Sequence, residues 1–140
     1  MTRLTHAAML LSLAASSACV VVAEDPPPPV NYAPWIDWAD SGCYWDDYNG
    51  DFIWYFEGDV YDDNGIADVE SVWADVYDAR GTLVETFRLF NEGGAYWFSD
   101  WLQYSTYLDC YYGGYEVDIV AYDWKEAYGA VTVIPRTLAR

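Results

Sequence analysis

The segment from Asp62 to Asp68 has the residue types of a cation-binding loop. Hard cations such as Ca²⁺ need several oxygen ligands, and a tight turn rich in carboxylates can supply them. When Gly65 is aligned with the sixth position of an EF-hand loop, Asp62, Asn64 and Asp68 fall on ligand positions. Val60 and Ser71 then occupy the first and last positions, where carboxylates are needed. The loop alone is therefore not expected to form a complete site, and ordinary turn chemistry remains the alternative explanation of its acidic residues.

Aromatic residues are the second unusual feature of the chain, which contains 8 Trp, 14 Tyr and 5 Phe. A small core cannot bury that many rings, so some of them must face solvent or a partner. Aromatic rings beside carboxylates can stack on sugars and hydrogen-bond their hydroxyl groups, and such surfaces also bind proteins. A binding face for an unknown protein or glycan at the cell surface is therefore one expectation.

Catalytic chemistry has little support in the sequence. The one histidine, His6, falls in an expected N-terminal signal, so the processed chain has no imidazole for a triad, a general base or a zinc site. Gly93-Gly94 and Gly113-Gly114 lack the context of a phosphate-binding loop. A carboxylate pair of the glycosidase type would remain, but a domain of this size offers little cleft for a distorted sugar. We therefore expect a protein that is not an enzyme and has no cofactor, unless Ca²⁺ binds.

The N-terminus is typical of an export signal, because a basic start precedes an apolar run and small residues. Cleavage before Glu24 suits an ordinary signal peptidase and gives a signal peptide over residues 1–23. The alternative is a lipoprotein signal over residues 1–18 with lipidation of Cys19, because Ser16-Ser17-Ala18-Cys19 is similar to a bacterial lipobox. Both predict an extracytoplasmic protein, either secreted or anchored by lipid to the cell envelope.

Behind the signal, residues 24–30 form a Pro-rich spacer and residues 31–140 have the length of one domain. The whole chain has a formal charge of −17, and all 23 acidic residues follow the signal. Such a charge repels nucleic acid and anionic lipid headgroups. Nucleic acid is therefore not expected as a partner, and contact with a membrane is expected only through a lipid on Cys19.

Cysteine usage predicts one disulfide. Removal or lipidation of Cys19 leaves Cys43 and Cys110, an even number in an oxidising compartment. A bridge that closes a loop of this length stabilises a fold by about 4 kcal/mol in the chain-entropy model. Two buried free thiols are the alternative.

The positions of these groups depend on strands, which the sequence predicts from period-2 alternation between turn signals. Phe52, Trp54 and Phe56 share one face of such a strand, and Val117 and Ile119 belong to the clearest alternating run. No amphipathic helix is evident, and about seven short strands fit an all-β sandwich. Strands are expected within residues 32–39, 51–57, 71–77, 82–90, 96–98, 115–123 and 128–134.

Two segments resemble bacterial immunoglobulin-like domains of the PKD and fibronectin-like kind: Gly58-Asp59-Val60-Tyr61-Asp62-Asp63-Asn64-Gly65-Ile66-Ala67-Asp68-Val69-Glu70-Ser71-Val72, and Gly114-Tyr115-Glu116-Val117 through Ala121-Tyr122-Asp123 to Val131-Thr132-Val133. Those families have an acidic turn between two strands, and a Gly-Tyr…Ala-x-Asp strand followed by a short closing strand. The resemblance covers residues 50–134 and implies a single immunoglobulin-like β-sandwich of about seven strands. It implies that Cys43 lies in the segment that enters the second strand. It also implies that Cys110 lies at the corner before the sixth strand, at the same end of the domain, so that the two cysteines pair. Tyr115 becomes a candidate for the tyrosine corner.

The same resemblance implies that the turns after the second and sixth strands lie at one end of the domain. Asp123 would then approach Asp62, Asp63 and Asp68 and could complete a composite Ca²⁺ site with them. Glu126 is a further candidate in the same turn.

The third and sixth strands are neighbours in such a fold, which would place Trp73, Tyr77 and Tyr122 on one outward face edged by carboxylates. We expect this face to be a binding surface. The alternative is that the segment containing Trp35, Trp38 and Trp45 covers it.

Overall fold

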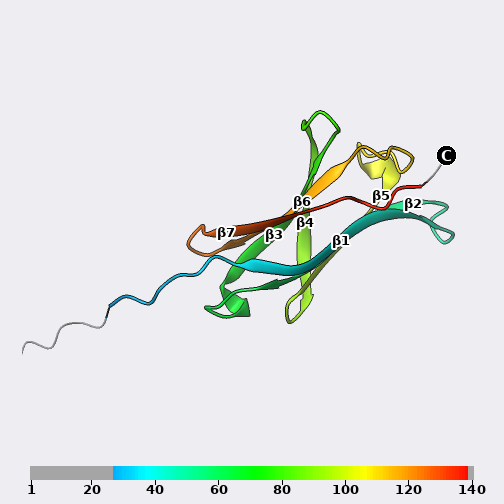
Figure 1. Cartoon of the computed structure of the whole chain (residues 1–140). Helices are drawn as coiled ribbons and strands as arrows, with labels where there is room; N and C mark the ends of the chain where they lie inside the picture. The colour runs from blue at the N-terminus through cyan, green and yellow to red at the C-terminus, as the bar shows by residue number, and fades with distance from the viewer. Residues whose placement is uncertain (1–26, 139–140) are drawn as a thin grey trace, which may run out of the picture.

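The computed structural model describes residues 27–138, which form an all-β unit of seven antiparallel strands in the sheet order β1-β2-β5-β4-β3-β6-β7 (Figure 1). The expected signal over residues 1–23, with Cys19, lies outside the described residues. Two 3₁₀ helices, η1 (Ile66–Asp68) and η2 (Gln103–Ser105), lie between strands. The strands are β1 (Trp35–Asp46), β2 (Asp51–Tyr61), β3 (Val69–Tyr77), β4 (Leu83–Gly93), β5 (Tyr96–Leu102), β6 (Glu116–Asp123) and β7 (Tyr128–Val133). No helix in this part of the chain has the length and apolar composition that crossing a membrane requires.

The sheet nearly closes on itself. Strand β4 pairs with β3 along most of its length and with β5 only at its end, where Phe90 lies opposite Phe98. After β7 the chain runs beside β1. There the Arg136 N–H donates to the Ser41 carbonyl (3.0 Å), and the Cys43 N–H donates to the Arg136 carbonyl (2.9 Å). These bonds form a parallel bridge between the first strand and the C-terminal segment. The architecture is therefore a barrel-like sheet with its two ends in contact.

The core consists of the inward positions that period-2 alternation predicts. Trp54 and Phe56 of β2 are fully buried, and Phe56 stacks on Phe87 of β4 with ring centroids 4.7 Å apart. Burial of each such ring stabilises the fold by roughly 2–3 kcal/mol relative to exposure. The other fully buried apolar positions of the strands include Val60, Val72, Ala74, Val76, Leu89, Val117, Ile119 and Ala121.

A disulfide joins Cys43 and Cys110, the pair that the sequence predicts, with their Cα atoms 5.7 Å apart. Cys43 lies inside β1 and not at the entry to the second strand, so that part of the expectation is wrong. Cys110 lies in the segment between η2 and β6, as expected. Nearby, the Tyr115 hydroxyl accepts a hydrogen bond from the Asp109 N–H (3.2 Å), which is the interaction that a tyrosine corner makes.

The first strand differs most from the sequence-based expectation, because β1 begins later than residue 32 and extends to Asp46. Residues Ser41 to Cys43 carry no clear alternation. They are strand because β2 binds one edge of them and the segment around Arg136 binds the other. Pairing across the sheet, rather than local propensity, therefore sets the length of β1.

Candidate metal centre

Two turns meet at the end of the sheet where the N-terminal arm, residues 27–34, enters β1 (Figure 1). One turn joins β2 to β3 through η1, and the other joins β6 to β7. Trp124 links them, because its backbone N–H donates to the Asp68 carbonyl (3.3 Å) and its indole N–H donates to the Ala67 carbonyl (3.2 Å). The acidic residues of both turns are thereby held on the same side of the fold.

The turn after β2 is fixed by Asp62. Its Oδ1 atom accepts a hydrogen bond from the Asn64 N–H (2.7 Å), and its carbonyl accepts one from the Gly65 N–H (2.9 Å). Gly65 has φ 113°, a value that favours glycine over residues with a side chain. The side chain of Asp62 is 7% exposed, and its second oxygen, Oδ2, is buried without a hydrogen-bond partner among the described residues.

Asp123 closes β6 and has no exposed surface. Its Oδ1 accepts hydrogen bonds from the Lys125 and Ala127 N–H groups, both at 2.8 Å, and its Oδ2 accepts one from Asn31 Nδ2 at 2.6 Å. Burial raises the pKa of this carboxyl, but the Asn31 amide and the two backbone donors together outweigh burial and hold the pKa below its usual value. The group is therefore a carboxylate at neutral pH although it is enclosed.

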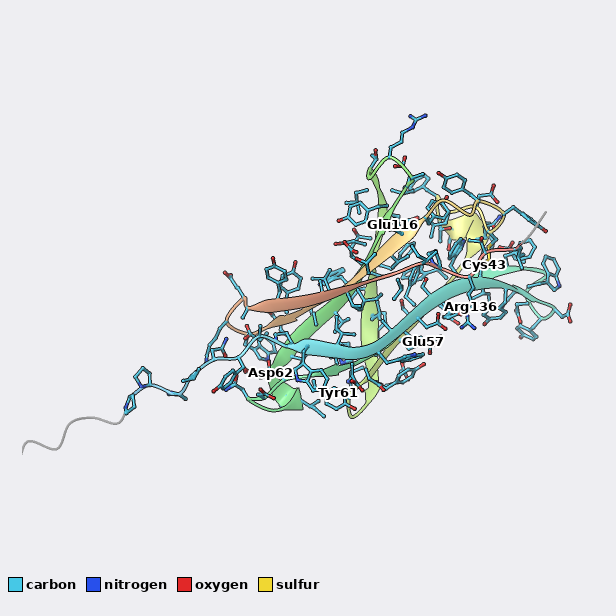
Figure 2. All side chains as sticks on the ribbon, viewed as in Figure 1. Cys43, Glu57, Tyr61, Asp62, Glu116 and Arg136 are labelled. Carbon is cyan, nitrogen blue, oxygen red and sulfur yellow. A yellow bond between two sulfur atoms is a disulfide. The ribbon has the colours of Figure 1, made fainter. Side chains whose placement is uncertain are left out.

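Asp62, Asp68 and Asp123 each place one carboxylate oxygen within 4.8 Å of the other two (Figure 2 labels Asp62). Calcium binds oxygen at 2.3–2.6 Å, so two of its ligands are separated by at most about 5 Å. Three oxygens at these separations can therefore bind one ion. Three carboxylates this close also repel each other, which is costly in a buried setting unless a cation balances them.

The N-terminal arm covers this group. Tyr32 N–H donates to Asn64 Oδ1 (2.8 Å), and Asn64 Nδ2 donates to the Val30 carbonyl (2.9 Å). Asn31 lies between these contacts with its amide against Asp123, and its Oδ1 atom is buried without a partner among the described residues. Asn31 is thus a fourth candidate oxygen ligand.

Sequence reasoning named three members of this group and missed the fourth. The structure brings Asp62, Asp68 and Asp123 together, but Asp63 is exposed and does not belong to the group. Glu126 is exposed at a turn position with φ 67° and is not a member either. Asn31 was missed because its place depends on the path of the arm, for which the sequence carries no local signal beyond the proline run that ends just before it.

The expected aromatic face on β3 and β6 exists only in part. Tyr122 is 36% exposed, whereas Trp73 and Tyr77 are half-buried. The Arg88 guanidinium lies over the Trp73 ring, 5.7 Å from its centroid. A single arginine thus covers the centre of this face.

The three tryptophans of the alternative interpretation lie in a different region of the sheet. Trp35, Trp38 and Trp45 lie in β1, at the other end of the strand order from β3 and β6, and are 45%, 46% and 51% exposed. The alternative in which they cover Trp73 is therefore wrong. Trp35 and Trp38 contribute instead to the outer side of β1, β2 and β5, a surface that sequence reasoning did not identify, and Trp45 packs against Phe52 at the end of the inner side.

Comparison with protein families, curated proteins and solved structures finds no match to this chain. The interpretation of the site therefore depends on its own geometry and chemistry.

Proposed function

We propose that the protein is a non-catalytic, extracytoplasmic module with an immunoglobulin-like β-sandwich fold, in which Ca²⁺ bound by Asp62, Asp68 and Asp123 fixes one end of the domain. Its role is to bind or support a partner at the cell surface. Export rests on the signal-like residues 1–23, and the lipid anchor rests on Cys19.

The strand order supports the sandwich. Immunoglobulin-like domains place their first, second, fifth and fourth strands in one sheet and their third, sixth and seventh in the other. The neighbours β1-β2-β5 and β3-β6-β7 are the same here, whereas β4 pairs with β3 over most of its length and with β5 at its end. The resemblance in residues 50–134 and the corner-type hydrogen bond of Tyr115 are consistent with that class.

The observation that carries the cation site is the Oδ2 atom of Asp62. A buried carboxylate oxygen normally has a hydrogen-bond donor, because an unpaired one loses its hydration without compensation. Here the neighbouring groups include the carboxylates of Asp68 and Asp123, each with an oxygen within 4.8 Å of one on Asp62, and ionised carboxylates only accept hydrogen bonds. A divalent cation satisfies all three groups at once.

Calcium suits the site better than magnesium. Calcium accepts irregular arrangements of carboxylate and amide oxygens, whereas magnesium needs near-ideal octahedral geometry and gives up its water reluctantly. The bound ion would connect the turn after β2, the end of η1 and the end of β6. Its contribution is then mechanical, because it adds a link between segments whose carboxylates otherwise repel each other.

The proposal is tested by calorimetric titration of the exported protein with CaCl₂ after treatment with chelator, together with thermal unfolding. We expect one site and a midpoint that rises with calcium, by the equivalent of about 2.7 kcal/mol at a hundredfold excess over Kd. Asp68→Asn should abolish the response. Asp63→Asn, which removes the same charge from an exposed neighbour outside the site, should retain it. An unchanged midpoint of the wild type at millimolar calcium would refute the proposal.

A further inference from the structure

The outer side of β1, β2 and β5 combines exposed rings with carboxylates. The pairing registers place Trp35 opposite Tyr61, and Trp38 opposite Asp59, which in turn lies opposite Tyr96. Residues directly opposite each other in an antiparallel pair point to the same face. We call this surface the acidic aromatic face. Its carboxylates are Asp40, Glu57, Asp59 and Asp100.

One position on this face already holds a basic side chain. The Arg136 guanidinium lies over the Tyr55 ring, 5.9 Å from its centroid, and donates a hydrogen bond to the Tyr55 hydroxyl at 2.6 Å. It also forms an ion pair with Asp40. Gly42 leaves room for this arrangement, because a Cβ atom there would lie 2.9 Å from the Tyr55 hydroxyl. Arg136, labelled in Figure 2, therefore shows how the face binds a guanidinium, with the Tyr55 ring beneath it and the Asp40 carboxylate at its edge.

The same combination recurs along the face without a basic partner. Trp38 lies beside Asp59, and Phe98 lies opposite Glu57. Arg136 with Asp40 is the ion pair that the described residues form, and no Lys or Arg among them pairs with Glu57, Asp59 or Asp100. The face is therefore built for cationic groups that this part of the chain does not supply.

Two tyrosines on this surface have a raised pKa, to which burial contributes most and nearby carboxylates also contribute. Burial, the hydrogen bond to Glu57 and the nearby charges of Glu57, Asp59 and Glu92 raise the pKa of Tyr96 to about 12. Burial and the charges of Asp100 and Asp46 raise the pKa of Tyr44 in the same direction. Anionic ligands would be repelled from such a surface, and cationic ones would be attracted.

We propose that the acidic aromatic face binds an extended, arginine- or lysine-rich segment of a partner protein, whose basic side chains lie over the exposed rings and pair with Glu57, Asp59 and Asp100. Alternate side chains of an extended segment point to one side, which matches a surface where ring and carboxylate positions follow the strands. The hollow lined by Ile53, Asp100 and Leu102 at one end of the face offers a place for one such side chain. This inference does not depend on the cation site, which lies in the turns at another part of the fold.

Charge favours a basic protein segment over a glycan. A neutral glycan needs rings and hydrogen-bonding groups but gains little from several negative charges close together. A basic segment gains from both the rings and the charge. The contacts of Arg136 with Tyr55 and Asp40 are an example of the second kind of contact on this surface.

The test uses the exported protein and a blocked octapeptide of alternating Arg and Thr, with the Glu-Thr peptide and chitohexaose as comparison ligands. Binding is measured by calorimetry and by amide chemical shifts. We expect the Arg-Thr peptide alone to bind, with shifts concentrated in β1, β2 and β5 and an affinity that falls with added salt. Binding of chitohexaose to the same amides, without binding of the peptide, would overturn the proposal in favour of a glycan.

Charge-matched variants distinguish the face from general attraction to an acidic protein. Glu57→Gln with Asp59→Asn should weaken peptide binding by about tenfold. Asp75→Asn with Glu116→Gln removes the same charge from β3 and β6 and should change the affinity less than twofold. Equal weakening by both pairs would refute a specific face. Trp38→Ala tests the ring without changing charge, and the unfolding midpoint of each variant shows that it folds.

Discussion

The substitution Asp62→Asn should stabilise the protein when no cation is present. The wild-type carboxylate is buried, has one oxygen without a donor, and lies within 4.8 Å of two other carboxylates. Asparagine keeps an oxygen for the Asn64 N–H, removes the charge and adds an N–H₂ group that can donate to Asp68 or Asp123. A residue that a cation site needs is thus expected to be unfavourable for folding without the cation.

The magnitude follows from the geometry. Two unit charges 4.8 Å apart repel by about 3.5 kcal/mol at an effective dielectric constant of 20, and Asp62 has two such neighbours. The backbone donors to Asp123 and water near the turn offset part of this repulsion, so a net gain of roughly 1–2 kcal/mol is expected. For a domain of about 100 residues this raises the unfolding midpoint by roughly 4–8 °C in chelator. With saturating calcium the order should reverse, because the wild type alone gains binding energy.

Thermal unfolding of wild type, Asp62→Asn and Asp63→Asn in chelator and in millimolar CaCl₂ measures both effects. Asp63→Asn removes an equal charge at an exposed position and should change stability by less than about 0.5 kcal/mol in either buffer. If Asp62→Asn lowers the midpoint in chelator, the carboxylate has a favourable partner in the cation-free protein. The argument from unbalanced charge would then be wrong.

Two further predictions concern other parts of the fold. Tyr96→Phe should remove the tyrosine whose pKa is about 12, as measured by the ultraviolet absorbance of tyrosinate. Because the pKa in the folded protein lies above the usual value of 10.0, the free energy of unfolding of the wild type should fall between about pH 10 and pH 12. The free energy of unfolding of the variant should fall less over the same range. Gly129→Ala should destabilise the protein by about 1–3 kcal/mol in urea unfolding, because the new Cβ would overlap the Pro34 carbonyl. Gly113→Ala, whose Cβ would lie 3.6 Å from its nearest neighbour, should not destabilise the protein in this way. A neutral Gly129→Ala would show that the arm moves freely away from β7.

The strand pattern could be predicted from sequence because burial on one face imposes a period of two. Val72, Ala74 and Val76 are buried as that rule requires, and so are Val117 and Ile119. The acidic turn was also recognisable, since Asp and Gly mark turns by their backbone chemistry. Local rules therefore identified β3, β6 and the acidic turn, and the resemblance to immunoglobulin-like domains added Asp123.

The acidic aromatic face could not be predicted in the same way. Trp35 and Trp38 are three positions apart, so a regular strand would point them to opposite sides. The register of β1 against β2 shifts between Ile36 and Trp38, and this irregularity returns both rings to one face. No local motif encodes such a shift, because it depends on how the partner strand pairs.

Asn31 illustrates a second limit. Its amide reaches Asp123, 92 positions along the chain, because the arm passes over two turns that only the complete fold brings together. Sequence patterns report the neighbours of a residue along an element. They do not report which distant segment crosses above it.

Closure of the sheet by Arg136 has a consequence for how the chain folds. The edge of β1 that does not pair with β2 bonds the segment at Arg136, more than ninety positions later in the chain. This pairing can form only after that segment has been synthesised, so contacts between distant residues dominate the native sheet. Chains of this kind fold slowly, and until then the β1–β2 hairpin exposes Trp54 and Phe56 together with unpaired strand edges. The high density of negative charge keeps such half-formed chains apart. The acidity of this protein therefore protects its folding as well as shaping its surface.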